Sequence, residues 1–158
     1  MSEWQQFGDL LTEESRLLGE LGTAALGLTQ ALVDNDPDAI EAAERRLEAQ
    51  LVLHATAFGQ RTSMQKRGFR SLTLPQVCAY APPSLRRALH ATAQEITVRG
   101  IALKLTVSNN KALILAGMER LARTVAVMQR AGTEQPGTYK RRGTVPPPSG
   151  SVIVSRRA

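Results

Sequence analysis

The sequence predicts an all-α protein: an antiparallel bundle of three long helices, packed like a coiled coil, with a disordered basic C-terminal tail. Alanine and leucine are the commonest residues, and aromatic residues make up only 4% of the 158 positions. This composition favours helices, because strands depend more on β-branched and aromatic side chains. Apolar residues also recur in steps of three and four along three long segments, and proline-containing turns separate these segments.

The first segment predicts a helix from about Glu3 to Val33. Ser2 and Gln5 form an S-x-x-Q capping box, which satisfies backbone N–H groups at the start of a helix. Glu14 is the only polar residue that interrupts its apolar seam. The seam residues are Trp4, Phe7, Leu11, Leu18, Leu21, Ala25, Leu28 and Leu32.

The second segment predicts a helix from about Pro37 to Arg67, with Gly68 as its end. Asp36 is the expected N-cap, and proline suits the first helical position because its missing N–H is not needed there. The connecting turn is short, so the first two helices are expected to be antiparallel. The expected seam consists of Ile40, Ala43, Leu47, Leu51, His54 and Phe58.

A short helix is expected from about residue 73 to Tyr80, and a third long helix from Pro83 to about Ala131, ending at Gly132. At 1.5 Å per residue, its ~49 residues would span roughly 73 Å, so it should extend past its partners or bend. Asn110 falls on the seam, where a buried amide fixes register. The other seam residues are Leu89, Ile96, Gly100, Leu103, Val107, Ile114, Gly117, Leu121, Val125 and Met128; the glycines would permit a close backbone approach or a bend.

Charge divides the chain unevenly. Residues 1–50 carry three basic and eleven acidic side chains, a net charge of −8, whereas residues 51–158 carry a net charge of +14. Residues 133–158 contain four of the eight prolines, one acidic residue and five basic ones. We therefore expect a helical domain over residues 1–132 and a disordered basic tail over residues 133–158.

The sequence argues against an enzyme. His54 and His90 have no catalytic partner at a suitable spacing, Cys78 is expected to pack as a small apolar residue, and no metal-ligand spacing or phosphate-binding loop occurs. We therefore predict no cofactor, no metal and no small-molecule substrate. No segment predicts a membrane span or a secretory signal, so the expected location is the cytoplasm. The basic balance leaves nucleic-acid or nucleoid binding as an alternative function.

Two motifs point to a known family. Ser108-Asn109-Asn110-Lys111-Ala112-Leu113-Ile114 lies within the long third helix, and Gly137-Thr138-Tyr139 follows that helix, with Gly143 four positions after Tyr139. In these motifs, and in its order of helices, the chain resembles the FlgN family of flagellar type III export chaperones. Lys140 stands where the family usually has glycine after the tyrosine. Asn109 and Asn110 are the asparagines that match the family motif.

The resemblance implies a cytoplasmic chaperone that binds the C-terminal helices of hook-filament junction proteins, also called hook-associated proteins. It would prevent their premature assembly and deliver them to the export gate. An amphipathic client helix needs an apolar face to bind, and we expect that face on the third helix. Its candidate residues are Leu113, Ile114, Leu121, Val125 and Met128; the alternative is that they close the protein's own core.

Tyr139 is the candidate for docking to the cytoplasmic domain of the export gate, as the resemblance implies. An aromatic ring can anchor a transient contact, and the neighbouring bases Lys140, Arg141 and Arg142 would speed the encounter with an acidic surface. The alternative is an exposed tyrosine without a function.

Overall fold

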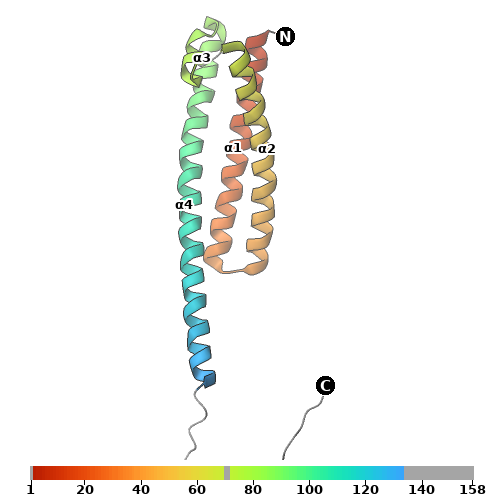
Figure 1. The fold of residues 1–158 in the computed structure, drawn as a ribbon. Coiled ribbons are helices and arrows are strands. Elements are labelled where there is room, and N and C mark those ends of the chain that lie inside the picture. The colour runs from red at the N-terminus through yellow and green to blue at the C-terminus, as the bar shows by residue number, and fades with distance from the viewer. Residues whose placement is uncertain (1, 70–71, 134–158) are drawn as a thin grey trace, which may run out of the picture. The chain divides into compact units, whose positions relative to one another are not determined.

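Four helices make up the part of the chain that the computed structural model describes, residues 2–69 and 72–133 (Figure 1). They are α1 (Glu3–Asp34), α2 (Pro37–Phe69), α3 (Leu74–Tyr80) and α4 (Pro83–Thr133). The described residues contain no strand, so the all-α prediction is confirmed for them. The chain divides into two compact units, residues 1–121 and 122–158. Apart from Thr133, the predicted tail lies outside the described residues.

The helix ends follow the capping residues. Ser2 accepts a hydrogen bond from the backbone N–H of Gln5 (3.2 Å), and the backbone N–H of Ser2 donates to Gln5 Oε1 (3.0 Å), which confirms the capping box. Asn35 takes the left-handed conformation (φ 53°) that ends α1. Asp36 Oδ1 then accepts from the backbone N–H groups of Asp38 and Ala39, both at 3.1 Å, so Asp36 caps α2 as predicted.

Contacts between helices fix their directions in the first unit. The guanidinium of Arg61 in α2 bonds to Glu14 in α1, and the ring of Phe69 near the end of α2 lies 4.7 Å from that of Trp4 near the start of α1. These contacts show that α1 and α2 are antiparallel. Ser15 in α1 bonds to Glu95 in α4, and Thr29 bonds to Asn110, so α1 and α4 run in the same direction.

The same contacts show how far α4 extends along α1. Thr29 and Asn110 are 81 positions apart, and Ser15 and Glu95 are 80 apart. At that offset, Asp34 at the end of α1 lies about level with Leu115. Residues 116–121 of α4 therefore continue past the turn between α1 and α2, as its length led us to expect.

One cluster of the hydrophobic core lies at the end of the first unit where α3 joins the long helices (Figure 1), and buried apolar side chains continue from it along α1 to Ala31. Phe7 and Leu11 of α1 are fully buried there, together with Val77 and Cys78 of α3. Phe69 packs against both Trp4 and Phe7, at ring-centroid distances of 4.7 and 5.4 Å. The remaining members of the core are Met64, Ala81, Leu89 and Ala93.

The predicted seam of α2 was partly wrong. Leu51 is 54% exposed and Phe58 47% exposed, whereas the buried residues of this helix are Ala57, Arg61 and Met64. The predicted and the observed residues both have helical spacing. The inward face is decided by the small side chain of Ala57 and by the ion pair between Arg61 and Glu14 of α1. The face that packs on α1 is thus rotated from the predicted one.

The predicted helix ends differ from the structure at two glycines. α2 continues through Gly68 to Phe69, whose ring is held by Trp4 and Phe7. α4 likewise passes Gly132 and ends at Thr133. A Cβ atom on Gly100 or Gly117 would meet nothing within 4 Å, so no neighbouring backbone approaches closely at these positions.

Candidate functional site

Asn110 holds α4 against α1 at the end of the first unit away from α3. Its side chain is 5% exposed; Nδ2 donates to the backbone carbonyl of Ala25 (3.0 Å), and Oδ1 accepts from the Thr29 hydroxyl (2.6 Å). A buried amide whose donor and acceptor are both used resists sliding of one helix along the other. The role in register predicted for Asn110 therefore has a structural basis.

A second polar contact holds the two helices nearer to α3. The guanidinium of Arg99 in α4 donates to the backbone carbonyl and the hydroxyl of Ser15, and this hydroxyl donates to Glu95 at 3.2 Å. The guanidinium of Arg99 packs against Gly19 of α1, where the absence of a side chain leaves room for it: a Cβ atom at position 19 would lie 3.2 Å from Arg99 Nη1. Two sets of polar contacts thus fix the register of α4.

An apolar groove of about 270 Å³ opens beside Asn110, and residues from all three long helices line it. Its walls come from Leu28 of α1, Leu47 of α2, and Val107, Asn110, Lys111, Ile114 and Leu115 of α4. We call it the three-helix groove. Lys111 is the one charged residue among those that line it.

Exposed apolar side chains extend both walls of this groove. Val107, Ile114 and Leu121 recur every seven residues on α4, and they are 50%, 40% and 65% exposed. On α2, Leu51 follows the groove residue Leu47 by four positions and is about half exposed. Apolar surface that is continuous and uncovered marks a site for another molecule.

The predicted site residues lie on α4 with different exposures. Ile114 lines the three-helix groove, and Leu113 beside it is partly buried. Leu121 is exposed at the end of the first unit, and Asn109 is exposed next to the buried Asn110. Two further predicted residues, Val125 (42% exposed) and Met128 (67% exposed), lie in the second unit, and Tyr139 lies outside the described residues.

Five of the groove residues were not among the predicted site residues: Leu28, Leu47, Val107, Lys111 and Leu115. Leu28 and Leu47 were expected to be ordinary members of helix seams, and Leu115 belonged to no seam. Their place in the groove depends on how three helices pack together. The spacing of residues within one helix does not predict that packing. The seven-residue spacing of Val107 and Ile114 was the one pattern that pointed to this wall.

A buried ion pair between α1 and α2 was also not predicted. Arg61 Nε lies 2.7 Å from Glu14 Oε2, and the two side chains are 8% and 2% exposed. Arg61 also donates to Gln65 Oε1, and its guanidinium lies 5.1 Å from the centre of the Phe58 ring. Glu14 had been recognised as an intruder in its seam, and the structure shows its partner.

The described residues show no arrangement suited to metal chemistry or to a membrane. No three His, Cys, Asp or Glu side chains in residues 2–69 and 72–133 are grouped so that they could hold a metal ion. Burial raises the pKa of the Cys78 thiol, which keeps it protonated and unreactive. None of the described helices combines the length and the apolar character needed to cross a bilayer.

The structure agrees with the resemblance seen in the sequence. It is all-α in the described residues, it has an apolar groove, and a buried asparagine of its longest helix bonds to α1. The family model described as FlgN protein matches residues 1–147. The chain belongs to the FlgN family. FlgN proteins are chaperones of flagellum biogenesis. The comparisons with curated proteins and with solved structures gave no match.

Proposed function

We propose that this FlgN protein is a cytoplasmic export chaperone for hook-filament junction proteins, and that the three-helix groove holds a C-terminal helix of the client. The observation that carries the proposal is the uncovered apolar groove, which is bordered by Ile114, Leu121 and Leu51. An amphipathic helix laid in such a groove would bury its apolar face and complete a four-helix packing. Bound in this way, the client helix could not join a growing flagellar structure.

Apolar burial supplies enough energy for this binding. Covering a Val, Leu, Ile or Phe side chain is worth about 1.5 to 3 kcal/mol when it is fully buried. Val107, Ile114, Leu121 and Leu51 are each about half exposed, so covering all four contributes several kcal/mol. An affinity change of tenfold corresponds to about 1.4 kcal/mol.

The test replaces two of these side chains by charged ones. Ile114→Asp combined with Leu121→Asp should weaken binding of a peptide that contains the last forty or so residues of a hook-filament junction protein by at least 100-fold. The fold should remain, because Ile114 and Leu121 are already 40% and 65% exposed in the free protein. Isothermal titration calorimetry measures the affinity, and circular dichroism checks the helix content.

A matched control lies on the same helix. Ile101 and Leu105 are 59% and 62% exposed. Leu105 and Ile114 are nine residues apart, which at 100° per residue puts them on opposite sides of α4. Ile101→Asp combined with Leu105→Asp should change the affinity less than twofold. Equal losses of affinity in the two double variants, or no loss of affinity in the first, would refute the groove as the client site.

The nucleic-acid alternative is tested by titration with duplex DNA at two salt concentrations.

Two further predicted contacts are proposed separately. Val125 and Met128 are exposed in the second unit, and we propose them as additional client contacts. Val125→Asp and Met128→Asp should each weaken client binding in the same titration.

Tyr139 is proposed as the residue that docks on the cytoplasmic domain of the export gate. Tyr139→Ala should leave client affinity unchanged and reduce capture by the gate domain in a pull-down; equal capture would refute this role.

A further inference from the structure

The middle of α2 carries no charge on any side. Between Glu48 and Arg61 there is no Asp, Glu, Lys or Arg, although this stretch makes more than three helical turns. Val52 is 65% exposed and lies about 140° around the helix from the buried residue Ala57, and Leu53, one turn before Ala57, is still 50% exposed. A helix that is apolar on its outer face as well as its inner face is typical of one that is covered on both sides.

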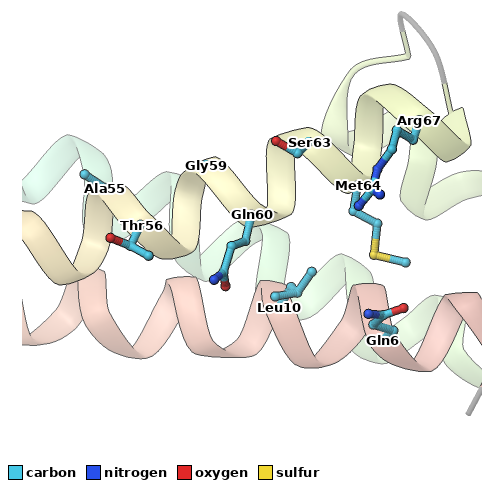
Figure 2. Close-up of a pocket in the computed structure, with 9 residues that line it drawn as sticks. All are labelled: Gln6, Leu10, Ala55, Thr56, Gly59, Gln60, Ser63, Met64 and Arg67. Atoms are coloured by element: carbon cyan, nitrogen blue, oxygen red, sulfur yellow. The ribbon is translucent and has the colours of Figure 1, made fainter.

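A groove of about 530 Å³ lies beside this stretch, between α2 and the first half of α1. Figure 2 shows Gln60 and Met64 reaching from α2 toward α1, where Leu10 and Gln6 lie. We call it the α1–α2 groove, to distinguish it from the three-helix groove. The residues that line it are Gln6, Leu10, Ala55, Thr56, Gly59, Gln60, Ser63, Met64 and Arg67.

Gly59 leaves this groove open at its centre. A Cβ atom at this position would meet nothing within 4 Å, so the missing side chain is not required by any contact within the protein. Glycine inside a helix destabilises it by roughly 1 kcal/mol relative to alanine. Gly22, Gly27, Gly100 and Gly117 are equally open, so what distinguishes Gly59 is its place in the α1–α2 groove.

Val52 and Gly59 complement each other across two copies of the chain. They are seven residues apart, so they lie on nearly the same side of α2, about 10 Å apart along its axis. If a second copy of α2 is laid antiparallel against the first, each Val52 falls on the Gly59 of the other copy. The two-fold axis then passes between Ala55 and Thr56, and the interface is self-complementary, as a two-fold dimer requires.

The charges of α2 favour the antiparallel arrangement. Residues 37–48 of α2 carry four acidic side chains and two arginines, one of which, Arg45, is paired with Glu41. Its end carries the exposed bases Lys66 and Arg67, whereas Arg61 is neutralised by its buried ion pair. An antiparallel pair puts the acidic start of each helix beside the basic end of the other. A parallel pair would bring like charges together, which is unfavourable.

We propose that this face of α2, with the α1–α2 groove, is a homodimer interface in which two copies pack antiparallel. The proposal does not depend on the client-binding function, because the interface and the three-helix groove use different residues. The strip from Glu41 to Arg67 is about 40 Å long and about 12 Å wide, which gives roughly 1,000 Å² buried over both copies. An interface of this size is at the low end of specific interfaces, where weak and reversible associations are found.

Sedimentation equilibrium of the full chain over about 1 to 200 µM tests the proposal. We expect a monomer–dimer equilibrium in this range. Gly59→Leu should fill the groove and raise the dissociation constant at least tenfold, while the helix itself becomes no less stable because the position is open. Gly27→Leu is the matched control, since a Cβ at Gly27 also meets nothing within 4 Å, and it should leave the equilibrium unchanged.

A charge exchange tests the orientation. Glu48→Lys alone should weaken the dimer severalfold, and adding Lys66→Glu should restore it. Thr56→Cys, close to the two-fold axis, should form an intermolecular disulfide on mild oxidation, whereas the buried Cys78 should not react. A monomer at every concentration would overturn the proposal, as would a dimer that Gly59→Leu does not weaken or a charge exchange that fails to restore it. If Gly59→Leu fails to fold, Val52→Asp replaces it with the same expected result.

Discussion

The buried pair of Glu14 and Arg61 should be the most sensitive polar contact in the first unit. Glu14→Ala removes the carboxylate from a guanidinium that is 8% exposed and that retains Gln65 as its other hydrogen-bond partner. Breaking a buried ion pair from one side costs about 3 to 5 kcal/mol, because the remaining charge stays buried without compensation. For a chain of this length, that loss corresponds to a decrease in melting temperature of roughly 10 °C.

Replacing both partners should cost much less than replacing one. In Glu14→Leu combined with Arg61→Met, no charge is left in the interface and the space is refilled by apolar groups of similar volume. Such exchanges are often neutral or stabilising. We therefore expect the double variant to lie within about 1 kcal/mol of the parent, so that the two positions are strongly coupled in a double-mutant cycle.

Urea titration provides the measurement. Trp4 lies in the aromatic cluster with Phe7 and Phe69, so its fluorescence reports the core end, while circular dichroism reports total helix. Glu41→Ala is the control: the Glu41–Arg45 pair is 63% and 75% exposed and should contribute less than about 1 kcal/mol. A loss below 1 kcal/mol for Glu14→Ala, or additive losses in the cycle, would refute the reasoning.

Two further predictions concern buried polar groups. Asn110→Ala should cost about 1 to 3 kcal/mol in urea titration, because it removes the buried hydrogen bonds of Asn110 to the Ala25 carbonyl and the Thr29 hydroxyl. Asn109→Ala at the exposed neighbouring position should change stability by less than about 0.5 kcal/mol; equal costs would contradict the register role. The folded state raises the pKa of the Cys78 thiol above its ordinary value of 9.0 by burial, so the folded chain holds this proton more tightly than the unfolded chain. The stability that this supplies is present below pH 9 and is lost as the pH rises through the folded pKa; a thiol reagent at pH 8 should react much faster after urea is added, and equal rates would contradict burial.

Local chemistry made the helix ends predictable. The Ser2–Gln5 capping box and the Asp36 cap depend on residues within three positions of one another, so the sequence contains the whole interaction. Prediction was weaker at Gly68, where the rings of distant residues keep the last turn of α2 helical. A stop that depends on packing cannot be seen in the neighbouring sequence.

The inner face of α2 required information from another helix. Its residues fit two helical faces, one through Leu51 and Phe58 and the other through Ala57 and Arg61. Choosing the larger apolar side chains gave the wrong residues at Leu51 and Phe58, because the buried carboxylate of Glu14 attracts Arg61 to the second face. The three-helix groove was unpredictable for the same reason, since it arises where side chains of three helices meet.

The aromatic cluster and the three-helix groove lie at opposite ends of the first unit. The aromatic and aliphatic core beside α3 closes one end, whereas the three-helix groove begins at the level of Asn110, toward the turn between α1 and α2. A helix that keeps apolar side chains uncovered there cannot rely on burial of those side chains to hold its position. The hydrogen bonds from Asn110 to Ala25 and Thr29 hold α4 on α1 instead. They fix α4 beside the groove without covering it, so Ile114 and Leu121 stay available to another helix while the register of the protein is preserved.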